Sequence, residues 1–166
     1  ITMPRGSGEQ TVRLDFERLW LTKAEAGAKH SDIDPRTLPP FHLSCESFRF
    51  GAIDLGHTEL LTSKSATGVN LDKLSFMQEN FSLQGSGRWD FEADTHRSAI
   101  SLAINGATLG GLLKNFDYEV ANIDGGSTAI EIEAVWGGMP TEFSLDKLHG
   151  SFKLRIDKGR FLDIEP

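Results

Sequence analysis

The sequence lacks several features from which binding sites and stabilising cross-links are built. Cys45 is the single cysteine, so neither an internal disulfide nor a thiolate cluster for a metal can form. The net charge is -7, with Lys and Arg scattered among the acids. The positive stripe that would attract nucleic acid or an anionic lipid leaflet is therefore missing. No apolar run approaches the ~20 residues of a membrane-spanning helix, and no signal peptide is recognisable.

The motifs of catalysis are missing as well. The chain has no Gly-x-Ser-x-Gly elbow, no His-Glu-x-x-His zinc motif and no phosphate-binding Walker loop. Gly85-Ser86-Gly87 lies inside an alternating run, where glycines indicate a bend or a close backbone approach. The acidic residues Asp90, Glu92 and Asp94 are interpreted as a solvated hairpin tip in preference to a calcium site. The five histidines are interpreted as isolated surface residues: His30, His42, His57, His96 and His149. We therefore predict no enzyme activity, no metal site and no cofactor.

The sequence does contain apolar residues at every second position over short runs, which is the pattern of half-buried β-strands. The longest strict run extends from Phe81 to Phe91. Other runs change phase, as between Cys45 and Phe48 and between Leu71 and Leu74, and such slips indicate β-bulges.

The number and spacing of these runs predict a mainly β fold. We expect a curved antiparallel sheet in the form of a groove, an open barrel or a sandwich-like layer. One short amphipathic helix is expected from Leu109 to Phe116, after Thr108 as N-cap, because apolar residues recur there at helical spacing. Residues 23–40, rich in alanine, charge and proline, are expected to connect two elements.

The length of 166 residues predicts a single domain spanning residues 1–166. The chain begins at Ile1 without an initiator Met and ends at Pro166 directly after a strand-like run. We therefore expect it to be a fragment of a longer chain.

The apolar stripe of these strands has two interpretations. Its residues form either the dry core of a closed structure or the inner face of an open trough that holds acyl chains. A strand facing a packed core and a strand facing a lipid groove alternate identically, so periodicity does not separate the two.

Short motifs add a resemblance to a known family. They are Asp34-Pro35-Arg36-Thr37-Leu38-Pro39, Phe48-Arg49-Phe50-Gly51, Leu55-Gly56, Ser86-Gly87-Arg88-Trp89, Trp136-Gly137-Gly138-Met139-Pro140, Phe143-Ser144-Leu145, Leu148-His149-Gly150 and Gly159 to Pro166. In these motifs, and most specifically from Trp136 onward, the chain resembles the late periplasmic region of the AsmA-like, TamB-related YhdP family of bacterial envelope proteins.

The resemblance implies a large protein of a Gram-negative bacterium, anchored in the inner membrane through segments outside these residues. Its periplasmic body would consist of repeated β units that form an apolar groove. The implied function is not enzymatic: the groove would bind phospholipid or another acyl lipid and transfer it passively between the inner and outer membranes. Nucleic acid is not an expected partner.

The residues expected to face lipid share an apolar side chain and an inward position in the alternation. They are Leu43, Val69, Leu71, Phe81, Leu83, Trp89, Ile100, Leu102, Ile104, Ile130, Ile132, Trp136, Phe152, Leu154 and Ile156. The alternative function is a structural or protein-interaction module of the envelope that recruits partners by strand addition. Uptake of lipid by delipidated protein distinguishes the two.

Overall fold

The computed structural model describes residues 11–22, 33–106, 108, 123–124, 126–142, 148–157 and 160–161. The elements in this part of the chain are β1 (Val12–Leu21), η1 (Pro35–Thr37), β2 (Phe41–Phe50), β3 (Ile53–Lys64), β4 (Gly68–Gln78), β5 (Phe81–Glu92), β6 (Thr95–Gly106), β7 (Ile123–Asp124), β8 (Thr128–Gly137), η2 (Pro140–Glu142), β9 (His149–Ile156) and β10 (Arg160–Phe161). Both η elements are 3₁₀ helices, and no α-helix occurs in these ranges. The predicted helix from Leu109 to Phe116 lies outside the described residues, as do residues 23–32 of the predicted connection.

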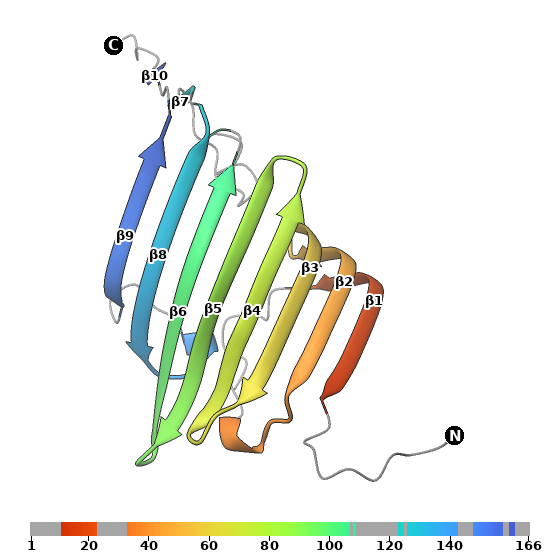
Figure 1. Ribbon diagram of the computed structural model, residues 1–166, viewed down its shortest axis with the longest axis vertical. Coiled ribbons are helices and arrows are strands. Elements are labelled where there is room, and N and C mark those ends of the chain that lie inside the picture. The colour runs from red at the N-terminus through yellow and green to blue at the C-terminus, as the bar shows by residue number, and fades with distance from the viewer. Residues whose placement is uncertain are drawn as a thin grey trace.

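Eight strands form one open sheet in the order β1-β2-β3-β4-β5-β6-β8-β9 (Figure 1). The short strands β7 and β10 make a separate antiparallel pair. The prediction of a mainly β fold is confirmed. Because the eight-stranded sheet does not close, β1 and β9 are its two edge strands.

The first pair of strands corrects the predicted antiparallel arrangement. β1 runs parallel to β2, with Val12 opposite Phe41 and Leu21 opposite Phe50. The following pairs of the sheet are antiparallel, so the sheet is mixed. Alternation reports which residues share a face, but it carries no strand direction. Parallel neighbours need a long connection, and the segment between β1 and β2 is long enough to supply it.

The predicted bulges are present. The β2–β3 register shifts between Cys45 and Phe48, and the β4–β5 register shifts between Leu71 and Leu74. An extra residue on one strand moves the following side chains to the opposite side, so the change of phase in the sequence restores the apolar residues to the same face.

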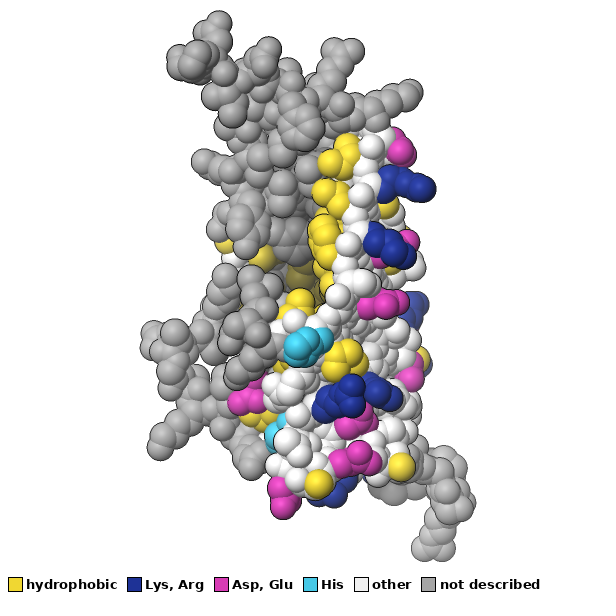
Figure 2. Space-filling view, turned by 90° about the vertical axis from the view of Figure 1, so that its left-hand side faces the viewer, with side chains coloured by type: hydrophobic (Ala, Val, Ile, Leu, Met, Phe, Trp, Pro, Cys, Tyr) yellow, Lys and Arg dark blue, Asp and Glu magenta, His cyan; other side chains and the backbone are white. Residues whose placement is uncertain are grey.

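The register gives the sheet two chemically different sides. The side that carries Phe81, Leu83 and Ile104 is called the apolar face, and the reverse side, which carries Gln84 and Glu131, is called the polar face. Figure 2, viewed from the β9 side, shows hydrophobic side chains in a line along one side of the sheet and charged side chains gathered on the other. Because side chains alternate between the two sides of each strand, the long strands present apolar residues to one face and polar residues to the other.

A cluster of buried residues lies on the apolar face near one end of the strands. Leu55, Phe81, Leu83 and Ile104 form this cluster, and less buried apolar residues pack against it. Between the cluster and the opposite end, β5 carries Gly87 on the same face. A Cβ atom on Gly87 would lie 2.5 Å from the Ala99 carbonyl oxygen, so this glycine permits a close approach of the β6 backbone.

Candidate functional site

All fifteen residues predicted to face lipid lie on the apolar face. Neighbours in a ladder share a face, and so do residues two positions apart on one strand. The direct ladder pairs among them are Val69–Trp89, Leu83–Ile104, Ile104–Ile130, Leu102–Ile132, Ile130–Leu154 and Ile132–Phe152. Leu43 joins the set because it lies opposite Leu60, whose partner on β4 is Leu74. One surface therefore collects the predicted residues from six strands, while their contact with lipid remains a prediction.

The exposure of these residues divides the set. Phe81, Leu83, Ile104 and Trp136 are buried and belong to the protein's own packing. Phe152 and Leu154 of β9 are 63% and 46% exposed, respectively. The other nine are half-buried. The two interpretations of the stripe therefore apply to different parts of it: some residues are ordinary core, and others present apolar surface.

The opposite edge of the apolar face contains residues that the prediction did not include. Val12, Leu14 and Phe16 of β1 are all exposed. Leu14 lies beside Leu43, and Phe16 lies beside Cys45. Their alternation was visible in the sequence, but it did not show that β1 joins the same sheet next to β2.

One end of the apolar face carries a polar and aromatic cluster. The Trp89 Nε1–H donates to His96 Nδ1 at 3.1 Å, and the His96 ring lies 4.4 Å from the Phe91 ring, centroid to centroid. The Arg36 guanidinium, from η1, lies 4.9 Å from the Phe91 centroid. Its hydrogen bonds to the Asp34 carboxylate hold the pKa of Asp34 below its usual value. The cluster anchors η1 at the ends of β5 and β6 through a cation–π contact.

The Trp136-Gly137-Gly138-Met139-Pro140 motif folds back at the same end. The Trp136 Nε1–H donates to the Met139 carbonyl at 3.0 Å, and the Glu142 carboxylate accepts from the Met139 N–H at 2.8 Å. Gly138 has a φ of +122°, a conformation that side chains disfavour. The Ser98 hydroxyl donates a hydrogen bond to the Gly138 carbonyl, and the Gly138 N–H donates to the His96 carbonyl. These bonds fix the loop after β8 and keep the Trp136 indole buried with its donor satisfied.

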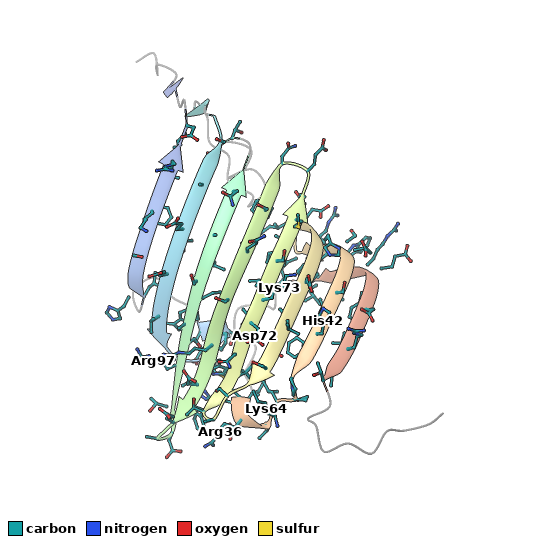
Figure 3. All side chains as sticks on the ribbon, in the orientation of Figure 1. Arg36, His42, Lys64, Asp72, Lys73 and Arg97 are labelled. Carbon is teal, nitrogen blue, oxygen red and sulfur yellow. The ribbon has the colours of Figure 1, made fainter. Side chains whose placement is uncertain are left out.

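The polar face carries ion pairs that cross neighbouring strands. Glu59 of β3 accepts a hydrogen bond from Lys73 on β4 and pairs with His42 on β2 at 3.2 Å. Figure 3 shows His42 and Lys73 on the strands that flank β3. The Lys73 hydrogen bond is the main cause that lowers the pKa of Glu59. At the other edge, Lys153 of β9 lies 3.0 Å from Glu131 of β8, which raises the pKa of Lys153.

The histidines and the acidic trio differ from their interpretation as plain surface groups. His42 and His96 are half-buried and hydrogen-bonded, so the description as isolated surface residues was wrong for them. Glu92 and Asp94 are exposed beside the β5–β6 turn, as expected for a hairpin tip. Asp90 differs from the expected hairpin-tip residue, because it is half-buried instead of exposed and its carboxylate accepts a hydrogen bond from the Thr67 hydroxyl at 2.7 Å.

The described side chains form no recognisable reaction centre. In the described ranges, no group of three or more His, Cys, Asp or Glu residues is placed to hold a metal ion. A shallow depression of about 660 Å³ lies over β4, β5, β6, β8 and β9 and is lined in part by Arg88, Glu133 and His149. Among the described residues, these three make no hydrogen bond with one another. No helix of the described chain is long and apolar enough to span a membrane.

The open sheet has one apolar face and one charged face, so the chain belongs to the class of β proteins that present a broad apolar surface. A scan against family models identifies the particular family: the model described as "YhdP protein" matches residues 1–166. The chain belongs to the YhdP family, a family of bacterial envelope proteins. Searches of curated proteins and of solved structures found no significant match.

Proposed function

We propose that the apolar face binds the acyl chains of phospholipid and that the chain is a non-enzymatic segment of a lipid-transfer protein. The full-length protein would be AsmA-like, anchored in the bacterial inner membrane and extended through the periplasm toward the outer membrane. Acyl chains would lie against the apolar face while head groups remain in water. Transfer is passive, so no residue has to perform chemistry.

The observation that carries the proposal is the continuity of the apolar face across the sheet. It extends from exposed Leu14 on β1 to exposed Phe152 on β9. Monomeric proteins rarely expose contiguous apolar patches of more than a few hundred Å², and larger ones mark ligand, membrane or protein contacts. Each methylene group buried against such a surface contributes about 0.8 kcal/mol, so two acyl chains supply a large driving force.

Membership of the YhdP family supports a location in the bacterial envelope and a role related to lipid transport. An envelope protein that crosses the periplasm meets phospholipid at both membranes. The described chain supplies an apolar surface of the right kind, and the anchor would lie in segments outside these residues.

The test is native mass spectrometry of the purified 166-residue chain, followed by reloading of delipidated protein from phospholipid vesicles. The proposal expects co-purifying phospholipid and saturable uptake of a fluorescent fatty acid. Phe152→Ser should reduce uptake because this ring is exposed on the apolar face. Met77→Ser is the matched control, because Met77 is 51% exposed and its β5 partner Ser82 lies on the polar face.

Two results would contradict the proposal. One is a lipid-free mass together with no uptake after delipidation. The other is uptake that decreases equally in the Phe152→Ser and Met77→Ser variants, because that would show nonspecific adsorption instead of binding to the apolar face.

A further inference from the structure

The outer edge of β9 is an open position for another strand. β9 pairs with β8 on one side, and no described strand lies on its other side. Its eight residues extend over about 26 Å at a rise of about 3.3 Å per residue. An edge strand of this length presents backbone donors and acceptors to an added strand.

The side chains on the apolar side of β9 are partnered on one flank only. Phe152 lies opposite Ile132, and Leu154 lies opposite Ile130, both on β8. Phe152 and Leu154 are nevertheless among the exposed large apolar residues of the chain. A strand added to β9 would place its own apolar residues on their uncovered flank, as cross-strand neighbours do within a sheet.

The polar side of β9 carries His149, Ser151, Lys153 and Arg155, and no acid occurs between His149 and Ile156. Lys153 is paired inward with Glu131. Arg155 lies opposite Ala129 and contacts no carboxylate of the described residues. A second copy of β9 at this edge would bring Lys153 and Arg155 close to like charges, which destabilises a strand pair.

We propose that the β9 edge binds one extended polypeptide segment in which apolar residues alternate with Asp or Glu. The apolar residues would continue the apolar face beside Phe152 and Leu154, and the acidic residues would face Arg155 and Lys153. The mode is strand addition, in which backbone hydrogen bonds give affinity and alternate side chains give specificity. This interaction surface shares Phe152 and Leu154 with the proposed lipid-binding face, but its selection for acidic residues depends on the sheet edge and the polar face, which lipid tails do not use.

β1 shows that this chain itself places such a segment at a sheet edge. Leu14 and Phe16 lie on the apolar face beside Leu43 and Cys45, while Asp15 lies between them. The alternating pattern proposed for the partner is therefore compatible with an edge of this sheet.

The probe is a fluorescent ten-residue peptide that alternates leucine or valine with glutamate. A sister peptide carries lysine in place of every glutamate. Binding to the whole 166-residue chain is measured by fluorescence anisotropy at low and high salt, and hydrogen exchange then locates the protected residues. We expect the glutamate peptide to bind more tightly, to weaken at high salt and to protect residues 149–156.

Arg155→Glu should lower the affinity for the glutamate peptide by about tenfold and raise the affinity for the lysine peptide, because the charge that selects the partner is reversed. Arg13→Glu is the matched control, since it makes the same change on the exposed β1 edge and should leave both affinities unchanged. Far-ultraviolet circular dichroism confirms that each variant is folded.

Several outcomes would overturn the proposal. They are equal affinity of the two peptides for wild type, no effect of Arg155→Glu, protection confined to residues outside β9, and absence of binding at millimolar peptide. Concentration-dependent self-association that the peptide does not compete with would assign the edge to a second copy of the chain, contrary to the proposal.

Discussion

Phe152 lies directly opposite Ile132 on the apolar face, yet Phe152 is 63% exposed while Ile132 is half-buried and packs against the buried cluster that contains Leu83. The difference arises because β9 is an edge strand, whereas β8 pairs with a strand on each side. A single ladder thus passes from packed core to exposed apolar surface.

Substitution of a buried and of an exposed residue of the apolar face should separate the effect on stability from the effect on lipid binding. Phe81→Ala should lower the free energy of unfolding by about 3–5 kcal/mol, because Phe81 is only 3% exposed and its loss leaves a cavity. Phe152→Ser should change that free energy by less than about 0.5 kcal/mol while reducing lipid uptake. Urea unfolding of both variants measures the first effect. A large loss of stability in Phe152→Ser would show that this ring is part of the packed core.

The glycines of the sheet give a second prediction. Gly87→Ala should destabilise the protein by about 1–3 kcal/mol, because the added Cβ would meet the Ala99 carbonyl oxygen at 2.5 Å. Gly137→Ala is the control, since a Cβ there meets nothing within 4 Å. That variant should be neutral or slightly more stable in thermal unfolding. Equal effects of the two substitutions would contradict the close approach of β6 to Gly87.

Acid should weaken the ion pairs around Glu59. Its pKa is lowered in the folded state from the ordinary value of 4.5, chiefly by the Lys73 hydrogen bond, so folding favours the ionised carboxylate. This stabilisation is fully present above the unfolded-state pKa and is lost as the pH falls through the folded-state pKa. Glu59→Gln should therefore cost about 0.2–1 kcal/mol at neutral pH and less at about pH 3, which lies below the ordinary pKa of 4.5. Urea unfolding at the two pH values checks this, and a cost that does not depend on pH would assign it to packing.

The loop after β8 depends on one carboxylate. Glu142→Ala should destabilise the protein by about 1 kcal/mol, because the Met139 N–H loses its acceptor. Glu142→Gln retains an oxygen acceptor at the same position and should recover most of the loss. Tryptophan fluorescence during thermal unfolding provides the measurement, since Trp136 donates to the Met139 carbonyl. Failure of the glutamine variant to recover stability would implicate the charge and not the hydrogen bond.

Much of the sheet was predictable because burial on one side imposes a period of two on the sequence. The run from Phe81 to Phe91 matches β5, and the phase slips at Cys45 and Leu71 match register shifts. Strand direction was not predictable, because the parallel pair of β1 and β2 has the same alternation as an antiparallel pair. The direction depends on how the connection returns across the sheet, and local sequence does not specify that path.

The membership of the apolar face was predictable, but the exposure of each residue was not. Leu83 and Leu154 are both leucines at inward positions, yet one is buried and the other is exposed because their strands occupy different places in the sheet. The bonds of His96 were also missed. They depend on Trp89 lying on the adjacent strand, and only the hairpin register reveals that proximity.

The single cysteine provides a built-in reporter of how firmly the first strand is held. Cys45 is fully buried on β2, beside Phe16 of the parallel edge strand β1. An edge strand can detach without unfolding of the whole sheet, and detachment of β1 would uncover the thiol. The rate at which a thiol reagent labels Cys45 under native conditions therefore measures how often β1 opens, with no engineered label in the chain.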